Sequence, residues 1–318
     1  MNVSVDVPTL LRSRVLFVSG KGGVGKTSIS AALGRLAAAQ GRRTLVLEVD
    51  NQHPTLPVLF GRPTAYEPSE VEKNLAIANI AWAPALEDWI ESIVSMRRLV
   101  RLIMKNRVVS LFLQVTPGAR DLVMLWRTME LARKFDLVIV DMPASGNAVA
   151  MLTVPLTAER LFPAGPIRRC ADELLAMYTR PDTRMLLVAL PEEMVVNETM
   201  ETYAKLGREV RGLEHPTVLL NRSSLPSFTE AERTLLRSLE AGVEPGTAAA
   251  EVLAAGRWEE ALEAATGEAL TRLRAVAGEV VALPALPRGE GARRIIAQLA
   301  SALARAGGLR VDLRGGAS

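Results

Sequence analysis

A nine-residue glycine-rich segment, Gly20 to Ser28, most constrains how this chain can fold. It reads GKGGVGKTS, follows the apolar run Val15 to Ser19, and leads into Thr27 to Gln40, whose apolar residues recur at helical spacing. Glycines let a loop curl so that its backbone N–H groups converge, and a helix start adds partial positive charge. The segment therefore predicts a strand, an anion-binding loop and a helix in direct succession.

Short apolar runs alternate with longer helical patterns along the rest of the chain. The further runs are Thr44 to Val49, Leu75 to Ile80, Leu137 to Val140, Met185 to Leu190, Thr217 to Leu220 and Glu279 to Ala282. Helical spacing marks Pro117 to Lys134, Asn197 to Gly212 and Gly289 to Ala306. Runs that are apolar on both faces are typical of buried parallel strands. We therefore predict an α/β fold with a doubly wound, mainly parallel sheet of about seven or eight strands, forming one P-loop NTPase domain over residues 1–318.

Two helical segments fit this scheme less simply. Residues 86–130 are very apolar and rich in Met, and we expect a helical insertion there. Its helices either pack on the sheet or present an adaptable apolar surface, with Leu99 to Val115 as the candidate groove, to a client protein. Residues 229–273 are rich in Ala and Glu and predict solvent-facing helices.

Composition excludes several other classes of protein. The chain has 318 residues, of which 49% are apolar, so it can build a large core. The excess of three positive charges is too small to indicate nucleic-acid binding. Cys170 is the single cysteine, which excludes an internal disulfide and a CxxC pair, and we interpret it as an inert packing residue. With neither a signal peptide nor a membrane-spanning run in the sequence, we expect a cytoplasmic protein.

The chemistry-bearing residues cluster where the predicted strands end. The expected phosphate-binding residues are Gly20, Lys21, Gly22, Gly23, Val24, Gly25, Lys26, Thr27 and Ser28. Lys26 is expected to reach the β- and γ-phosphates, and the Thr27 hydroxyl to ligate Mg²⁺. Asp141 ends an apolar strand in a Walker B pattern, near the metal. Asp50 follows the second strand, where it can orient water or cap a loop. Thr27, Asp50 and Asp141 are thus the candidate metal ligands.

Lys21, a second lysine that an ordinary phosphate loop does not need, indicates the deviant Walker group. KGGVGKT resembles the loops of partition ATPases, the nitrogenase iron protein, and the arsenical-pump and tail-anchored-protein-targeting ATPases. The stretch from Asp50 to His53 is similar to the TDPAH switch I of the last family, and DMPASGN, from Asp141 to Asn147, to its DTAPTGH switch II. This resemblance implies that Lys21 contacts nucleotide across a dimer interface and that Asp50 polarises the attacking water, making Asp50, Lys21 and Lys26 the catalytic candidates.

Weaker matches extend the resemblance over most of the chain. Asn221 matches the asparagine that reads adenine, and the stretch with Pro287 resembles the loop that covers the base, so the resemblance implies ATP with Mg²⁺. Further matches are TPGARD at 116–121, PEE at 191–193, and Glu198-Thr199. The chain departs from the family at Asn51-Gln52, Met142 and Asn147, and its one cysteine cannot supply a bridging zinc site or arsenite-binding thiolates.

Three functional hypotheses follow. The first is a MgATP-hydrolysing dimeric switch of the arsenical-pump and tail-anchored-targeting family, a homodimer or a heterodimer with a paralogue, that couples nucleotide state to a client or partner protein. The second is a partition- or positioning-type ATPase that cycles on a surface. The third is a weakly hydrolysing nucleotide-binding scaffold paired with a paralogue. No nucleic-acid partner and no integral membrane segment are expected.

Overall fold

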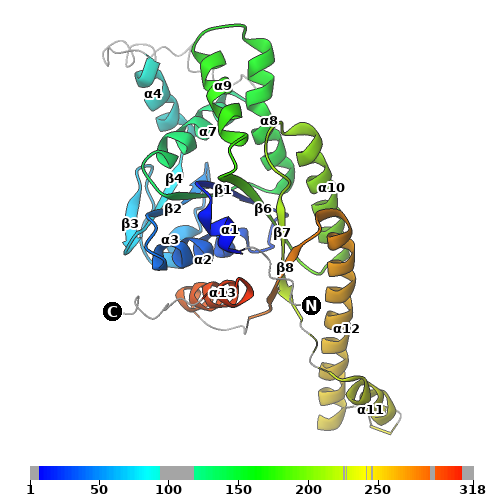
Figure 1. Cartoon of the computed structure of the whole chain (residues 1–318). Helices are drawn as coiled ribbons and strands as arrows, with labels where there is room; N and C mark the ends of the chain where they lie inside the picture. Colours follow the sequence, from blue (N-terminus) through cyan, green and yellow to red (C-terminus); the bar gives the residue numbers. More distant parts are fainter. Residues whose placement is uncertain are drawn as a thin grey trace.

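The computed structural model describes residues 7–93, 118–224, 226, 228–240, 242–244, 246–286 and 291–309. An eight-stranded sheet forms its centre, in the order β3-β4-β2-β5-β1-β6-β7-β8 (Figure 1). The strands are β1 (Val15–Ser19), β2 (Thr44–Val49), β3 (Ser69–Glu72), β4 (Leu75–Ile80), β5 (Leu137–Asp141), β6 (Thr183–Ala189), β7 (Thr217–Ser223) and β8 (Val280–Pro284). Every adjacent pair is parallel except β3–β4. The predicted doubly wound α/β fold is confirmed.

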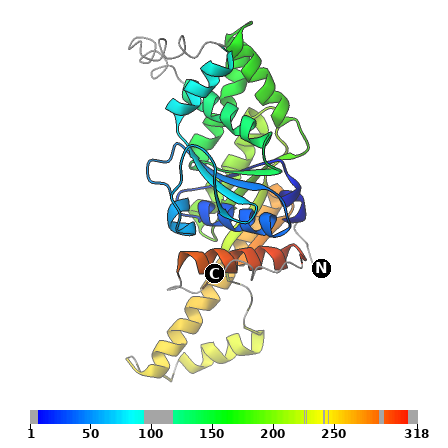
Figure 2. The ribbon, with the colours of Figure 1, turned by 90° about the vertical axis from the view of Figure 1, so that its left-hand side faces the viewer.

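Helices cover both faces of the sheet. They are α1 (Val7–Arg12), α2 (Lys26–Ala39), α3 (Leu56–Phe60), α4 (Trp82–Ile93), α7 (Ala119–Ala132), α8 (Ser145–Leu161), α9 (Pro166–Tyr178), α10 (Glu193–Glu209), α11 (Glu230–Glu240), α12 (Ala248–Ala277) and α13 (Ala292–Ala306). One layer holds α2, with α1, α3 and α13 packed on it, and the other holds α7, α9, α10 and α12 (Figures 1 and 2). No helix within the described ranges is long and apolar enough to cross a membrane.

The central strands could be recognised in the sequence as continuous apolar runs because they are buried on both faces. All five residues of β1 and all five of β5 are buried, because helices lie above and below them. The strand order changes direction beside β1: β5 and β2 lie on one side of it, and β6 and β7 on the other. Ligands of open α/β sheets bind at such a switch point, beyond the carboxyl ends of the strands. The loop that follows β1 is therefore the place to look for a site.

The two helical segments that stood out in the sequence differ in their setting. Within 86–130, α4 packs against α7, and α7 packs on β5; residues 94–117 of that segment, including the expected groove at Leu99 to Val115, lie outside the described part. Within 229–273, α11 and the first half of α12 extend away from the sheet as a helical arm (Figure 2). Leu235, Leu239 and Trp258 of this arm are exposed.

Candidate active site

The glycine-rich loop after β1 packs so closely on its neighbours that two of its glycines have no room for a side chain. Gly20 has φ +145°, and a Cβ there would lie 2.1 Å from the Val188 carbonyl oxygen at the end of β6. Gly25, with φ +95°, occupies the N-cap of α2, and the Ile29 N–H donates to its carbonyl. Both backbone conformations favour glycine. The loop from Gly20 to Gly25 thus leads directly into the N-terminus of α2, where anions bind.

Lys26, Thr27 and Asp141 meet at the centre of the site. The Thr27 hydroxyl donates to Asp141 Oδ2 at 2.5 Å, and the Ser30 hydroxyl donates to Asp141 Oδ1 at 3.3 Å. The Lys26 ammonium donates to the Lys21 carbonyl at 3.2 Å. The structure therefore brings together three of the predicted side chains, two from the first turn of α2 and one from the end of β5.

Burial shifts the pKa of two of these groups toward their uncharged forms, and a bound ligand of opposite charge would counter each shift. Asp141 is 8% exposed, and its burial raises the pKa of its carboxyl to about 6, against the opposing effects of the Thr27 hydrogen bond and of Lys26. Desolvation lowers the pKa of Lys26, while Asp141 and Glu198 raise it. Both charged forms are therefore incompletely compensated in the ligand-free chain. A bound polyanion with its cation would supply the missing partners.

Glu48, which sequence reasoning passed over, organises the loop after β2. Its side chain is 1% exposed and accepts hydrogen bonds from Asn51 Nδ2 at 2.9 Å, the Thr55 N–H at 2.7 Å and the Leu56 N–H at 3.3 Å. Strand pairing also sets Glu48 beside Asp141. The sequence could have indicated this role, because a glutamate inside an otherwise apolar strand is buried and a buried carboxylate needs hydrogen-bond donors.

Asp50 lies in the same loop but is exposed. Its backbone has φ +46°, and its N–H donates to the Ile80 carbonyl at 2.7 Å. The Asn79 side chain also holds this loop. Its Oδ1 accepts a hydrogen bond from the Asn51 N–H at 3.3 Å, and its Nδ2 donates to the Asn51 carbonyl at 2.8 Å. Asp50 is close enough to Asp121 at the start of α7 to raise the pKa of that carboxyl, although burial of Asp121 is the larger cause. The His53 side chain is exposed at the surface.

Asn221, at the end of β7, contacts the glycine-rich loop itself. Its Nδ2 donates to the Val24 carbonyl at 2.9 Å, and its Oδ1 accepts from the Arg222 N–H at 3.0 Å. The residue is 5% exposed, and the same Nδ2 lies 2.8 Å from where a Gly25 Cβ would stand. Asn221 therefore helps to fix the loop's shape. Pro287 lies outside the described residues.

Glu198 joins the loop to the segment after β5. One carboxylate oxygen lies 3.4 Å from Lys21 Nζ, and the other accepts a hydrogen bond from the Ser145 hydroxyl. Ser145 is 2% exposed and begins α8, just beyond Asp141. The side chain of Lys21 thus contacts its own chain here.

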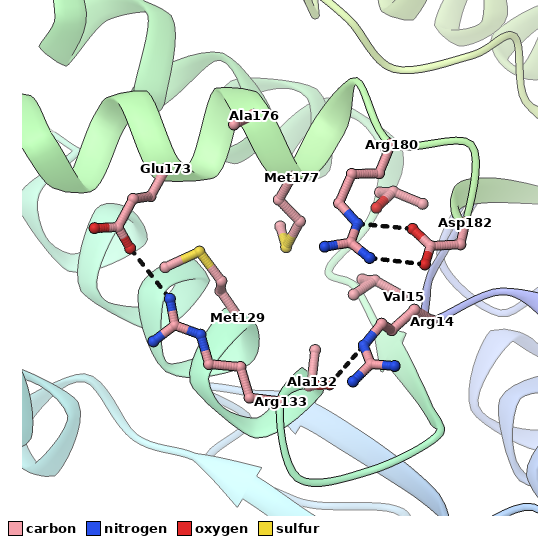
Figure 3. Close-up of a pocket in the computed structure, with 11 residues that line it drawn as sticks. Arg14, Val15, Met129, Ala132, Arg133, Glu173, Ala176, Met177, Arg180 and Asp182 are labelled. Carbon is pink, nitrogen blue, oxygen red and sulfur yellow. Dashed lines mark hydrogen bonds and ion pairs between the residues drawn. The ribbon is translucent and has the colours of Figure 1, made fainter.

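A cavity of about 250 Å³ lies at the opposite edge of the sheet, where β1 and β6 begin (Figure 3). Its charged groups are largely paired: Arg133 with Glu173 at 3.3 Å, and Arg180 with Asp182 at 2.9 Å. None of the predicted site residues lines it. The side chains predicted to bind phosphate and metal thus converge at the carboxyl edge.

Comparison with known sequences agrees with this geometry. The family described as anion-transporting ATPase matches residues 13–181, slightly more than half of the chain. The chain belongs to the anion-transporting ATPase family. The matched part of the chain runs from the start of β1 through α9, and so includes the glycine-rich loop, Asp50 and Asp141. The resemblance to the arsenical-pump and tail-anchored-targeting family, predicted from these motifs, is confirmed.

Several relatives of this chain extend the similarity. ATPase BagA of Mycobacterium tuberculosis is 26% identical over 269 residues, which cover 80% of this chain and 77% of that protein. An uncharacterized protein of Streptomyces coelicolor is 34% identical over 184 residues, 52% of this chain and 44% of that protein. ATPase ASNA1 homolog 1 of Paramecium tetraurelia is 26% identical over 149 residues, 46% and 44% of the two chains.

Proposed function

We propose that this chain binds and hydrolyses MgATP and works as a dimeric switch that couples its nucleotide state to a client or partner protein. The observation that carries the proposal is the contact between Thr27 and Asp141 beside Lys26, at the end of a glycine-rich loop and the start of a helix. A hydroxyl, a carboxylate and an ammonium in this setting suit a metal-bound triphosphate. The proposal places the enzyme in the cytosol, where ATP is available.

The residues present fit a magnesium ion. Within the described ranges no three His, Cys, Asp or Glu side chains lie together so as to hold a metal by themselves. Magnesium is commonly bound through one or two protein oxygens, waters and substrate phosphates, and Thr27 with Asp141 supplies that oxygen pair. Bound there, the ion would neutralise charge on the β- and γ-phosphates. We assign Asp50, which is exposed and farther along the same edge, to the attacking water rather than to direct metal ligation.

In the proposed reaction each catalytic side chain has a separate task. Lys26 balances charge on the transferred phosphoryl group. Asp50 orients the attacking water, which its exposed position after β2 permits. Lys21 contacts the nucleotide held by a second subunit, since one chain carries one phosphate-binding loop. The second subunit is an identical chain or a paralogue.

Adenine recognition is assigned to Asn221, with Pro287 covering the base. One hydrogen of the Asn221 amide is used by the Val24 carbonyl, which leaves its second hydrogen and an oxygen lone pair for a base. In this proposal Asn221 links base recognition to the shape of the loop. ATP is therefore the expected nucleotide, and no nucleic-acid partner is proposed.

Two measurements on purified protein test the proposal. Steady-state phosphate release with ATP and Mg²⁺ should be lost in Asp50→Asn, and sedimentation with the same nucleotide should show a dimer that Lys26→Ala does not form. Equal phosphate release from wild type and Asp50→Asn would instead support the non-hydrolysing scaffold. Unchanged sedimentation of the wild type, alone and with MgATP, would refute the dimeric switch. ATP-dependent pelleting with liposomes or DNA would favour the surface-cycling ATPase.

A further inference from the structure

Glu198 of α10 connects two parts of the site that lie far apart in the sequence. One of its carboxylate oxygens lies 3.4 Å from the Lys21 ammonium in the glycine-rich loop, and the other accepts a hydrogen bond from Ser145 at the start of α8. Ser145 follows Asp141 by four residues, in the segment that resembles switch II. A single side chain thus contacts both the loop lysine and a residue within the switch-like segment.

Lys21 is directed to its own chain by this contact. Glu198 is the carboxylate that pairs with Lys21 among the described residues, and it also raises the pKa of Lys26 against the effect of burial. Glu198 therefore acts as the counter-ion of Lys21 when the loop holds no phosphate, whereas Asp141 has the larger influence on Lys26. The side chains of Lys21 and Glu198 are 33% and 37% exposed, so their ion pair is weak enough to be exchanged readily.

A triphosphate in the loop would compete directly with this carboxylate. The phosphate oxygens and Glu198 carry the same sign of charge, and both are attracted to the Lys21 ammonium. Binding should therefore favour a state in which Glu198 has left Lys21. Because Glu198 also holds Ser145, its departure would change the support of the switch segment at the same time.

We propose that Glu198 is a positioning residue that retains Lys21 on its own subunit and releases it when the loop receives a triphosphate, so that Lys21 becomes available to the second subunit. The proposal rests on the dimeric switch proposed above and adds to it a residue that sets the nucleotide threshold for association. Glu198 touches no reacting atom in this scheme and acts only through Lys21 and Ser145.

The first test examines the ligand-free protein, independently of any dimer. Lysine acetylation by a limiting amount of acetic anhydride is measured residue by residue by mass spectrometry. Glu198→Gln keeps an oxygen for Ser145 but removes the charge, so Lys21 should lose its ion pair and be acetylated more than in wild type. Glu201→Gln, an exposed neutral substitution one turn along α10, is the matched control and should leave Lys21 labelling unchanged. Equal Lys21 labelling in wild type and Glu198→Gln overturns the proposal.

The second test measures the threshold itself. Sedimentation velocity is followed as adenylyl imidodiphosphate with Mg²⁺ is titrated, and Glu198→Gln should reach half-maximal dimer at a nucleotide concentration roughly two- to fivefold lower than wild type, as expected for loss of an exposed ion pair. An unchanged or higher threshold refutes the release of Lys21. Absence of any wild-type dimer refutes the dimeric switch, and the acetylation comparison then still decides whether Glu198 restrains Lys21. Matching circular dichroism and melting temperatures establish that both variants are folded.

Discussion

Replacing Asp141 by asparagine is expected to stabilise the ligand-free protein, and to do so more at neutral pH than in mild acid. Burial raises the pKa of this carboxyl from 3.8 to about 6 in the folded chain. An acid whose pKa is raised on folding favours the folded state when protonated, and that contribution is lost as pH rises through the folded pKa. Asparagine keeps an oxygen for the Thr27 hydroxyl and has no charge to desolvate.

The size of the effect follows from the pKa difference. The shift of about two units corresponds to about 3 kcal/mol of unfolding free energy at neutral pH, since each unit is worth about 1.4 kcal/mol. At pH 5 the carboxyl is mostly protonated in the folded state, and the cost is about 2 kcal/mol. The stability difference between Asp141→Asn and wild type should therefore grow by about 1 kcal/mol between pH 5 and pH 7.5.

Urea unfolding, followed by circular dichroism at several pH values, measures this difference. Asp136→Asn is the control: its exposed carboxyl bonds Arg43, which lowers its pKa to about 2, so its effect on stability should be constant over the same range. A flat pH dependence for Asp141→Asn would refute the assignment of the burial cost to this carboxylate. With Mg²⁺ and ADP present, wild type should gain stability and Asp141→Asn should gain much less, because the carboxylate is the proposed metal ligand.

Other substitutions test the loops and the buried thiol. Glu48→Ala should cost about 2 to 4 kcal/mol in urea unfolding, since it leaves buried donors of the following loop without an acceptor, and should speed proteolysis between residues 51 and 56; Glu48→Gln should cost less. Gly20→Ala places a Cβ 2.1 Å from the Val188 carbonyl and should lower the melting temperature by several degrees, whereas Gly22→Ala, with nothing within 4 Å, should leave it unchanged. Cys170 is buried, which raises the pKa of its thiol to about 12, so Ellman's reagent at pH 8 should detect no thiol in the native chain and one in urea; a rapid native reaction would contradict this.

The sheet could be predicted from the sequence wherever a strand is buried on both faces. The runs that became β1, β2 and β4 were placed to the residue, because continuous apolar residues leave few alternatives. β3 was missed because its sequence, SEVE, is polar: it is an antiparallel edge strand that pairs only with β4. α8 was missed as well, since it is only weakly amphipathic and contains Pro155.

The candidate site also contains parts that could be predicted from the sequence and parts that could not. The loop from Gly20 to Ser28 could be predicted because its geometry depends on local backbone freedom and on the strand and helix beside it. The contacts of Glu48 and Glu198 could not, since each depends on how loops fold back across the carboxyl edge. Asn221 was expected to face a base, whereas its main visible contact is with the Val24 carbonyl. Only the three-dimensional arrangement shows that contact.

The helical arm has a mechanical consequence for this site. α12 is anchored through Ser224, which lies three residues beyond Asn221. The Ser224 N–H donates to the Thr266 hydroxyl, and the Ser224 hydroxyl donates to the Glu259 carboxylate. From Glu259, the outer of these two contacts, to its first residue, Ala248, α12 runs about 16.5 Å at 1.5 Å per residue. A tilt of about 5° at that anchor would move the far end by about 1.4 Å. Small adjustments beside the glycine-rich loop would thus be magnified at the outer end of α12 and at the exposed Leu235 of α11, which packs on it.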